Sequence, residues 1–260
     1  MTAYGPAFLF LLAFAAPSAS VPAADDVLGR TARAVEKFWE QFSAVTCTES
    51  VLQEKLNEHG KVYFKTESAY DYLIMLQISG NDFLVEESRV PVKQAKETKN
   101  TPLLVTNGFS TLVLVFHPFF QGGYEFSRPE TEQMDGHDVL RVRFQQAPRG
   151  RSPSVLKLRQ REYPLAWRGS AWIDPPTGAI VKIEAELQES MEDVGLRTLH
   201  AAVRYAPVHF TEDAEAHWLP VEAAIEAETP RQHWRNVHRF TNYKYFSVKT
   251  KSQTESPRTQ

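Results

Sequence analysis

Histidine is the residue type in this sequence with the widest chemical range, and its eight copies could supply metal ligands or general bases. Metal-binding histidines usually recur at short fixed spacings, as in His-Glu-x-x-His, and the copies here form no such motif. His233 and His238 are five residues apart, so on one strand they point to opposite faces of a sheet. We therefore expect no metal site and no cofactor.

Nucleophiles and paired acids give no stronger signal. The sequence has neither a Gly-x-Ser-x-Gly elbow nor a Gly-rich phosphate loop. Cys47 is the single cysteine, and its strand-like context favours a small buried hydrophobe over a reactive thiol. The acid pairs Glu86-Glu87 and Glu192-Asp193 are interpreted as strand ends and turns. We assign no catalytic residue, although a site assembled from distant strands stays open.

One segment, residues 141–168, is strongly basic. Its eight Lys and Arg residues and one acid, Glu162, give it a local net charge of +7. Such a run is usually a solvated face, and the alternative is a contact with an acidic partner or an anionic lipid headgroup. The whole chain carries a net charge of only −3, which does not favour a nucleic-acid partner.

The pattern of the chain predicts a β-rich fold. Val181 and Ile183 alternate with charged residues in a half-buried strand. Asp135-Gly136 and the stretch 174–178, Asp-Pro-Pro-Thr-Gly, are predicted hairpin turns. Similar alternating runs follow one another from residue 44 to residue 249. We expect a mainly β (α+β) fold, a single curved antiparallel sheet or half-open β-barrel of about ten strands.

Two helices accompany the predicted strands. Apolar residues at helical spacing predict an amphipathic helix from Asp25 to about Phe42, which needs a sheet to lie on. A second, short helix is predicted from Gly108 to about Phe116, ended by Pro118. It belongs to the most apolar stretch outside the N-terminus. This stretch is either ordinary core or a hydrophobic lid over a cavity.

The N-terminus predicts export. The run Ala7–Ala16 is apolar, too short to span a bilayer, and followed by the small residues Ser18-Ala-Ser20. We expect residues 1–20 to be a signal peptide, residues 21–250 one domain, and residues 251–260 a disordered tail. The expected location is the periplasm or the exterior of the cell, after cleavage.

Several short motifs resemble the lipoprotein-carrier (LolA-like) superfamily, which includes outer-membrane lipoprotein-sorting proteins and RseB/MucB-like regulators. The matching pieces are Trp172-Ile-Asp-Pro-Pro-Thr-Gly178, Trp218-Leu-Pro220 and the last strand, Arg239 to Val248. The resemblance covers roughly residues 25–248. It implies a half-open barrel closed by helices, with an apolar cavity for acyl chains and no enzymatic activity. We assign no residue to the lid arginine of these carriers, and the basic segment lies outside the matching pattern.

The expected function is therefore that of a non-enzymatic, monomeric carrier or binding protein for an acyl chain, a lipid or a lipoprotein. The residues expected to line and cover the cavity are apolar: Phe116, Phe119, Phe120, Val142, Phe144, Val181 and Ile183. The alternatives are an RseB/MucB-like sensor or protein-interaction scaffold, and a hydrolase with a site built across strands. A plainly filled core remains the structural alternative to a cavity.

Overall fold

The computed structural model describes residues 24–79, 82–93, 106–158, 161–211 and 213–246. The expected signal peptide (1–20), the expected tail (251–260) and most of the loop expected between Pro91 and Pro102 lie outside the described residues. The expected domain boundaries therefore stay predictions.

The molecule is built on one open antiparallel sheet of eleven strands, in the order β3-β2-β1-β13-β12-β11-β10-β9-β6-β4, with β5 also paired to β6. The expected fold class is confirmed. The strands are β1 (Val45–Leu56), β2 (Val62–Ser79), β3 (Asp82–Lys93), β4 (Tyr124–Phe126), β5 (Glu130–Met134), β6 (His137–Gln146), β9 (Trp167–Ile173), β10 (Ile180–Leu187), β11 (Thr198–Val208), β12 (His217–Glu228) and β13 (His233–Tyr245). A separate two-stranded sheet consists of β7 (Val155–Leu158) and β8 (Arg161–Pro164).

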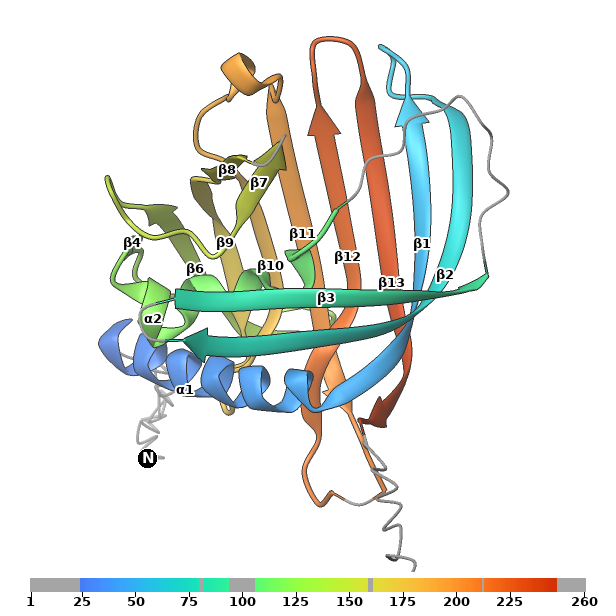
Figure 1. Ribbon diagram of the computed structural model, residues 1–260. Helices are drawn as coiled ribbons and strands as arrows, with labels where there is room; N and C mark the ends of the chain where they lie inside the picture. The colour runs from blue at the N-terminus through green and yellow to red at the C-terminus, as the bar shows by residue number, and fades with distance from the viewer. Residues whose placement is uncertain (1–23, 80–81, 94–105, 159–160, 212, 247–260) are drawn as a thin grey trace, which may run out of the picture.

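The two ends of the chain meet in the middle of this sheet, because β1 pairs with β13 along its whole length. The hairpin of β2 and β3 then curves across the front of the other strands, next to the N-terminal helix (Figure 1). After β3 the chain crosses the interior and restarts at the opposite edge with β4. The crossing segment is therefore enclosed by the curved sheet.

Helix α1 (Ala24–Ser43) covers one side of the interior, as its apolar spacing predicts. Val27, Val35, Phe38 and Phe42 are buried on its inner face. The ring of Phe38 meets that of Tyr205 on β11 edge to face, with centroids 5.7 Å apart. This contact fixes the helix to the middle of the sheet.

The crossing segment forms a 3₁₀ helix, η1 (Phe109–Phe116), followed by a short α-helix, α2 (Pro118–Gln121). Gly108 begins η1 at a φ of 78°, a left-handed conformation that suits glycine. His117 lies in the extended conformation that a following proline requires, and its Nδ1 accepts a hydrogen bond from the N–H of Phe119. The short helix predicted here is confirmed, although its hydrogen bonding is 3₁₀. A further short 3₁₀ turn, η2 (Glu192–Val194), follows β10.

Both predicted hairpin turns are present. Asp135 and Gly136 have φ values of 52° and 81°, and Gly178 has a φ of 74°. One expected arm, residues 124–134, is instead divided into β4 and β5. Pro129 lies in the gap, where it has no N–H to donate to the sheet.

We expect Gly136→Val and Gly178→Val each to lower the free energy of unfolding by about 1 kcal/mol or more, because a β-branched residue resists positive φ. Gly178→Val should cost more, since an added Cβ would lie 3.0 Å from the backbone of Arg30, whereas Gly136 has open space around it. Thermal melting of both variants checks the order. Gly122→Val is the control, because Gly122 has a φ of −64° and nothing within 4 Å of an added Cβ. Unchanged melting temperatures for both turn variants would contradict the turn assignment.

Candidate functional site

The predicted cavity residues gather around η1. Phe116, Phe120, Val142, Phe144 and Ile183 belong to one buried core cluster. The ring of Phe116 lies edge to face against that of Phe144, with centroids 5.9 Å apart. The structure therefore brings together the covering segment and the strands β6 and β10 that it was expected to cover.

Two of the predicted residues lie at the margin of this cluster. Phe119 is partly buried, and the guanidinium group of Arg151 stacks over its ring. Val181 is half-buried, because the pairing of β10 with β9 shifts register between Ile180 and Lys182. This irregularity turns Ile180 inward in its place. Phe126, which the sequence did not single out, packs on Phe116 with ring centroids 4.9 Å apart.

The interior of the sheet is filled by η1. Seven of its eight residues, 110–116, are buried, and Leu114, Val115 and Phe116 are 0% exposed. The voids beside it are small, about 10 Å³ next to Ser110 and about 20 Å³ between α1 and the sheet. In this conformation η1 occupies the space in which the sequence placed an acyl chain.

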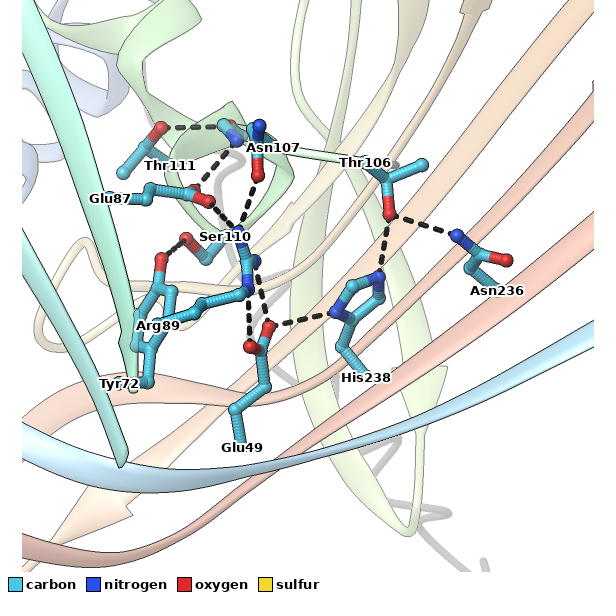
Figure 2. A network of polar contacts seen from close by, with 11 residues as sticks. Glu49, Tyr72, Glu87, Arg89, Thr106, Asn107, Ser110, Thr111, Asn236 and His238 are labelled. Carbon is cyan, nitrogen blue, oxygen red and sulfur yellow. Dashed lines mark hydrogen bonds and ion pairs between the residues drawn. The ribbon is translucent and has the colours of Figure 1, made fainter. Parts of the chain in front are cut away.

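A buried polar cluster lies at the start of η1 (Figure 2). It consists of the inward-facing side chains of Glu49 on β1, Glu87 and Arg89 on β3, and His238 on β13. Register explains their meeting. Arg89 lies opposite Tyr72 on β2, and the pairs Glu49–Phe240 and Val51–His238 make Glu49 and His238 diagonal neighbours.

Arg89 is the centre of the cluster. Its Nε and Nη2 donate to the two carboxylate oxygens of Glu49, at 2.5 and 2.9 Å, in a bidentate ion pair. Its Nη1 donates to Glu87 at 2.7 Å and also to the side-chain oxygen of Asn107. The side chain of Glu49 is 0% exposed, so this pairing supplies the charge compensation that a buried carboxylate needs.

A chain of hydrogen bonds continues from Glu49 to the residue that precedes Asn107. His238 Nδ1 lies 2.8 Å from Glu49, and His238 Nε2 lies 2.7 Å from the hydroxyl of Thr106. The amide of Asn236 donates to the same hydroxyl. The Thr106 proton is then directed at Nε2, which assigns the neutral tautomer of His238 with its proton on Nδ1.

The environment shifts the pKa of the two central groups in opposite directions. Burial alone would raise the pKa of Glu49, but hydrogen bonds from His238 and Arg89, with the positive charge of Arg89, lower it below its ordinary value. Burial opposes the charge of Arg89, yet its hydrogen bonds to Glu49 and the negative charges of Glu87 and Glu49 raise its pKa. Both groups are therefore held in their ionised forms.

The cluster fastens the start of η1 to the sheet. The N–H of Gly108 donates to Glu87 at 2.7 Å. Two tyrosines hold the next turn: the hydroxyl of Tyr72 lies 3.0 Å from the Ser110 hydroxyl, and that of Tyr205 donates to the Ser110 carbonyl at 2.9 Å. The remainder of the segment, from Leu112 to Phe116, packs through apolar side chains.

Sequence reasoning missed this cluster. Glu86-Glu87 was interpreted as a strand end, but Glu87 points inward and only Glu86 is exposed. The expectation that His233 and His238 face opposite ways is confirmed: His233 pairs with Glu226 on the outer face, and His238 with Glu49 inside. Among the described residues, no group of three or more His, Cys, Asp and Glu side chains is arranged to hold a metal ion.

The basic segment is partly neutralised by acids on neighbouring strands. Arg141 and Arg143 pair with Glu130 on β5, and Arg168 pairs with Glu186 on β10 at 2.8 Å. Arg143, Arg168 and Glu186 line an open groove of about 510 Å³. These ion pairs favour the interpretation of a solvated face, and an acidic partner or anionic lipid at this segment stays a prediction.

The comparisons with known proteins support the same fold. No family model matches the chain, and no curated protein matches it either. Among solved structures, a putative outer membrane lipoprotein-sorting protein domain from Vibrio parahaemolyticus is 12% identical with a TM-score of 0.44, covering 89% of this chain and 95% of that one. A LolA superfamily protein from Nitrosomonas europaea is 11% identical with a TM-score of 0.39, covering 87% and 95%.

The MucA/MucB complex of Pseudomonas aeruginosa also matches, at 10% identity and a TM-score of 0.24, covering 86% of this chain and 99% of that one. The resemblance to the LolA superfamily that the motifs indicate is thus also found among solved structures. In the described part of the chain, no helix has the length and apolar character needed to cross a membrane.

We expect Glu49→Gln to lower the free energy of unfolding at neutral pH by about 3 kcal/mol, because it removes one partner of a buried ion pair. The lowered pKa of Glu49 means that its carboxylate stabilises the fold above its unfolded-state pKa of about 4.3, and that this contribution is lost as the pH falls through the folded-state pKa. The gap between wild type and variant should therefore close in acid. Urea denaturation at a series of pH values measures it.

Glu86→Gln is the matched control for this experiment, since Glu86 is an exposed neighbour of Glu87 on the same strand. It should change stability by less than about 0.5 kcal/mol. A gap between wild type and Glu49→Gln that stays constant from neutral to acid pH would contradict an ionised Glu49 as the source.

Cys47 should react slowly in the folded protein. It is buried, and burial, with the nearby charge of Glu49, raises the pKa of its thiol to about 12, despite a hydrogen bond with Tyr243. Little thiolate then exists at neutral pH. A maleimide labelling time course, compared with that of the denatured chain, tests this. Equally fast labelling of both would show that the thiol is accessible.

Proposed function

We propose that this chain is a non-enzymatic binding or carrier protein that takes an acyl chain, a lipid or a lipid-modified protein into its apolar interior. The observation that carries the proposal is η1 itself, an apolar segment enclosed by an open sheet. Its hydrogen bonds to the sheet gather at residues 106–110, while residues 112–116 pack by side-chain contact. An acyl chain offers the same apolar contacts and can take the place of η1.

The same proposal places the mature chain in the periplasm or outside the cell as a monomer. The apolar run Ala7–Ala16 and the small residues after it support removal of a signal peptide. Mass spectrometry of lipid that co-purifies with the mature protein would identify the cargo.

We expect Tyr205→Phe to bind an uncharged fluorescent acyl methyl ester more tightly than wild type, by about fivefold. The variant loses the hydrogen bond to Ser110, worth about 1 kcal/mol, and so destabilises the state in which η1 fills the interior. Tyr245→Phe is the control, because its hydroxyl bonds Asp213, far from η1 in the chain. Fluorescence titration of the three proteins measures the affinities. Absence of ester binding in all three would overturn the proposed function.

A second candidate is a sensor or scaffold that contacts another protein. The exposed edge strand favours it: β3 ends the strand order of the sheet, and its Val90 and Val92 are 58% and 60% exposed. Such an edge can accept a strand from a partner. A stable protein complex without extractable lipid would favour this candidate over the carrier.

A hydrolase is supported by one observation, the hydrogen-bonded order Glu49–His238–Thr106. It matches the acid, base and nucleophile of a catalytic triad. Asn236 also bonds the Thr106 hydroxyl, and Thr106 is buried beside a void of only about 10 Å³, which favours a structural role. Hydrolysis of an acyl ester by wild type that is lost in Thr106→Val would favour the enzyme.

A further inference from the structure

The contacts that η1 makes with the polar cluster reveal what that corner of the interior recognises. The carboxylate of Glu87 accepts the backbone N–H of Gly108 at 2.7 Å, and the guanidinium of Arg89 donates to the side-chain carbonyl of Asn107 (Figure 2). Glu87 and Arg89 are held side by side by their own ion pair at 2.7 Å. The sheet therefore presents one fixed acceptor beside one fixed donor.

Both groups that satisfy this pair are uncharged. An N–H and a C=O on neighbouring atoms are the hydrogen-bonding groups of a primary amide or of a short peptide. The segment η1 consequently combines an amide-like polar end with an apolar body.

The charges of the cluster disfavour an anion at the same place. Two carboxylates, those of Glu49 and Glu87, surround the single guanidinium of Arg89, and their side chains are 0% and 6% exposed. With His238 neutral, the cluster carries one excess negative charge. A carboxylate or phosphate brought beside it adds a like charge in a region of low dielectric, which is costly.

A cation is also a poor fit. An ammonium group would satisfy Glu87, but it would leave the Nη1 of Arg89 without the acceptor that Asn107 provides, and would place two positive charges together. An uncharged donor–acceptor end meets both requirements at once.

We propose that this corner binds the uncharged amide end of an acyl ligand, with its N–H to Glu87 and its C=O to Arg89, and discriminates against free fatty acids. The proposal rests on the proposed function and narrows the ligand class to acyl chains that end in a primary amide or a short peptide. It makes Glu87 and Arg89 determinants of ligand specificity.

Three ligands with the same chain test the proposal: decanamide, decanoate and decylammonium, each competing with the fluorescent acyl methyl ester at neutral pH. We expect decanamide to bind the wild-type protein at least about tenfold more tightly than either ion, since hydrogen bonds to charged groups contribute about 1.5–3 kcal/mol. Decanoate that binds as tightly as decanamide overturns the proposal.

Glu87→Gln tests the residue assignment, because glutamine keeps an acceptor oxygen and loses the negative charge. The preference for decanamide over decanoate should fall by about tenfold in this variant, and remain in Glu86→Gln, the exposed neighbour on β3. An unchanged preference in Glu87→Gln overturns the assignment. The wild-type comparison stands if the variant fails to fold, as its thermal melt would show.

The two proposals fail in different ways. If the ester does not bind at all, the proposed function and this inference fall together. If the ester binds but the amide has no advantage over the carboxylate, only the inference falls, and the interior is a general acyl site.

Discussion

The burial of one carboxylate, that of Glu49, is the constraint on which the interior depends. An ionised group with no exposure is tolerated only when charges and hydrogen bonds replace its water. Arg89 supplies two hydrogen bonds from β3, and His238 supplies a third from β13. Since β1 is paired directly to β13 and, through β2, linked to β3, the same carboxylate fixes the curvature that brings these strands around the interior.

Two different forces hold η1 in that interior. Its first residues are bound by directional contacts to Glu87, Arg89, Tyr72 and Tyr205, and its later residues by apolar packing. Apolar burial is non-directional, so another apolar group of similar volume can replace it. Hydrogen bonds of defined geometry cannot be replaced so freely. Exchange of η1 for a ligand is therefore controlled at residues 106–110, and the volume of the ligand at residues 112–116.

Local patterns predicted the architecture well and the polar cluster not at all. Strand alternation and the turns at Asp135-Gly136 and Asp174–Gly178 are encoded in neighbouring residues, and the sheet follows from them. Glu49 and His238 lie 189 residues apart, so their contact depends on the pairing of β1 with β13, which no local pattern contains. Inward acids such as Glu87 also look like surface acids until their partners are known. The half-burial of Val181 depends on a register shift that alternation alone cannot reveal.

The balance between these forces sets what kind of chain can displace η1. Each charge-assisted hydrogen bond at the start of η1 contributes about 1.5–3 kcal/mol, and a ligand binds with an affinity reduced by the fraction of molecules that are open. Burial of an acyl chain returns about 0.8 kcal/mol for each CH₂. Two or three methylenes therefore offset about one such hydrogen bond, so a short chain cannot compete with η1 and a long one can. A ligand whose polar end also replaces the contacts of Asn107 and Gly108 lowers that threshold, because the hydrogen bonds are then exchanged and not lost. Chain length and polar end thus act on the same equilibrium, and both are set by the position of η1 between the polar cluster and the apolar core.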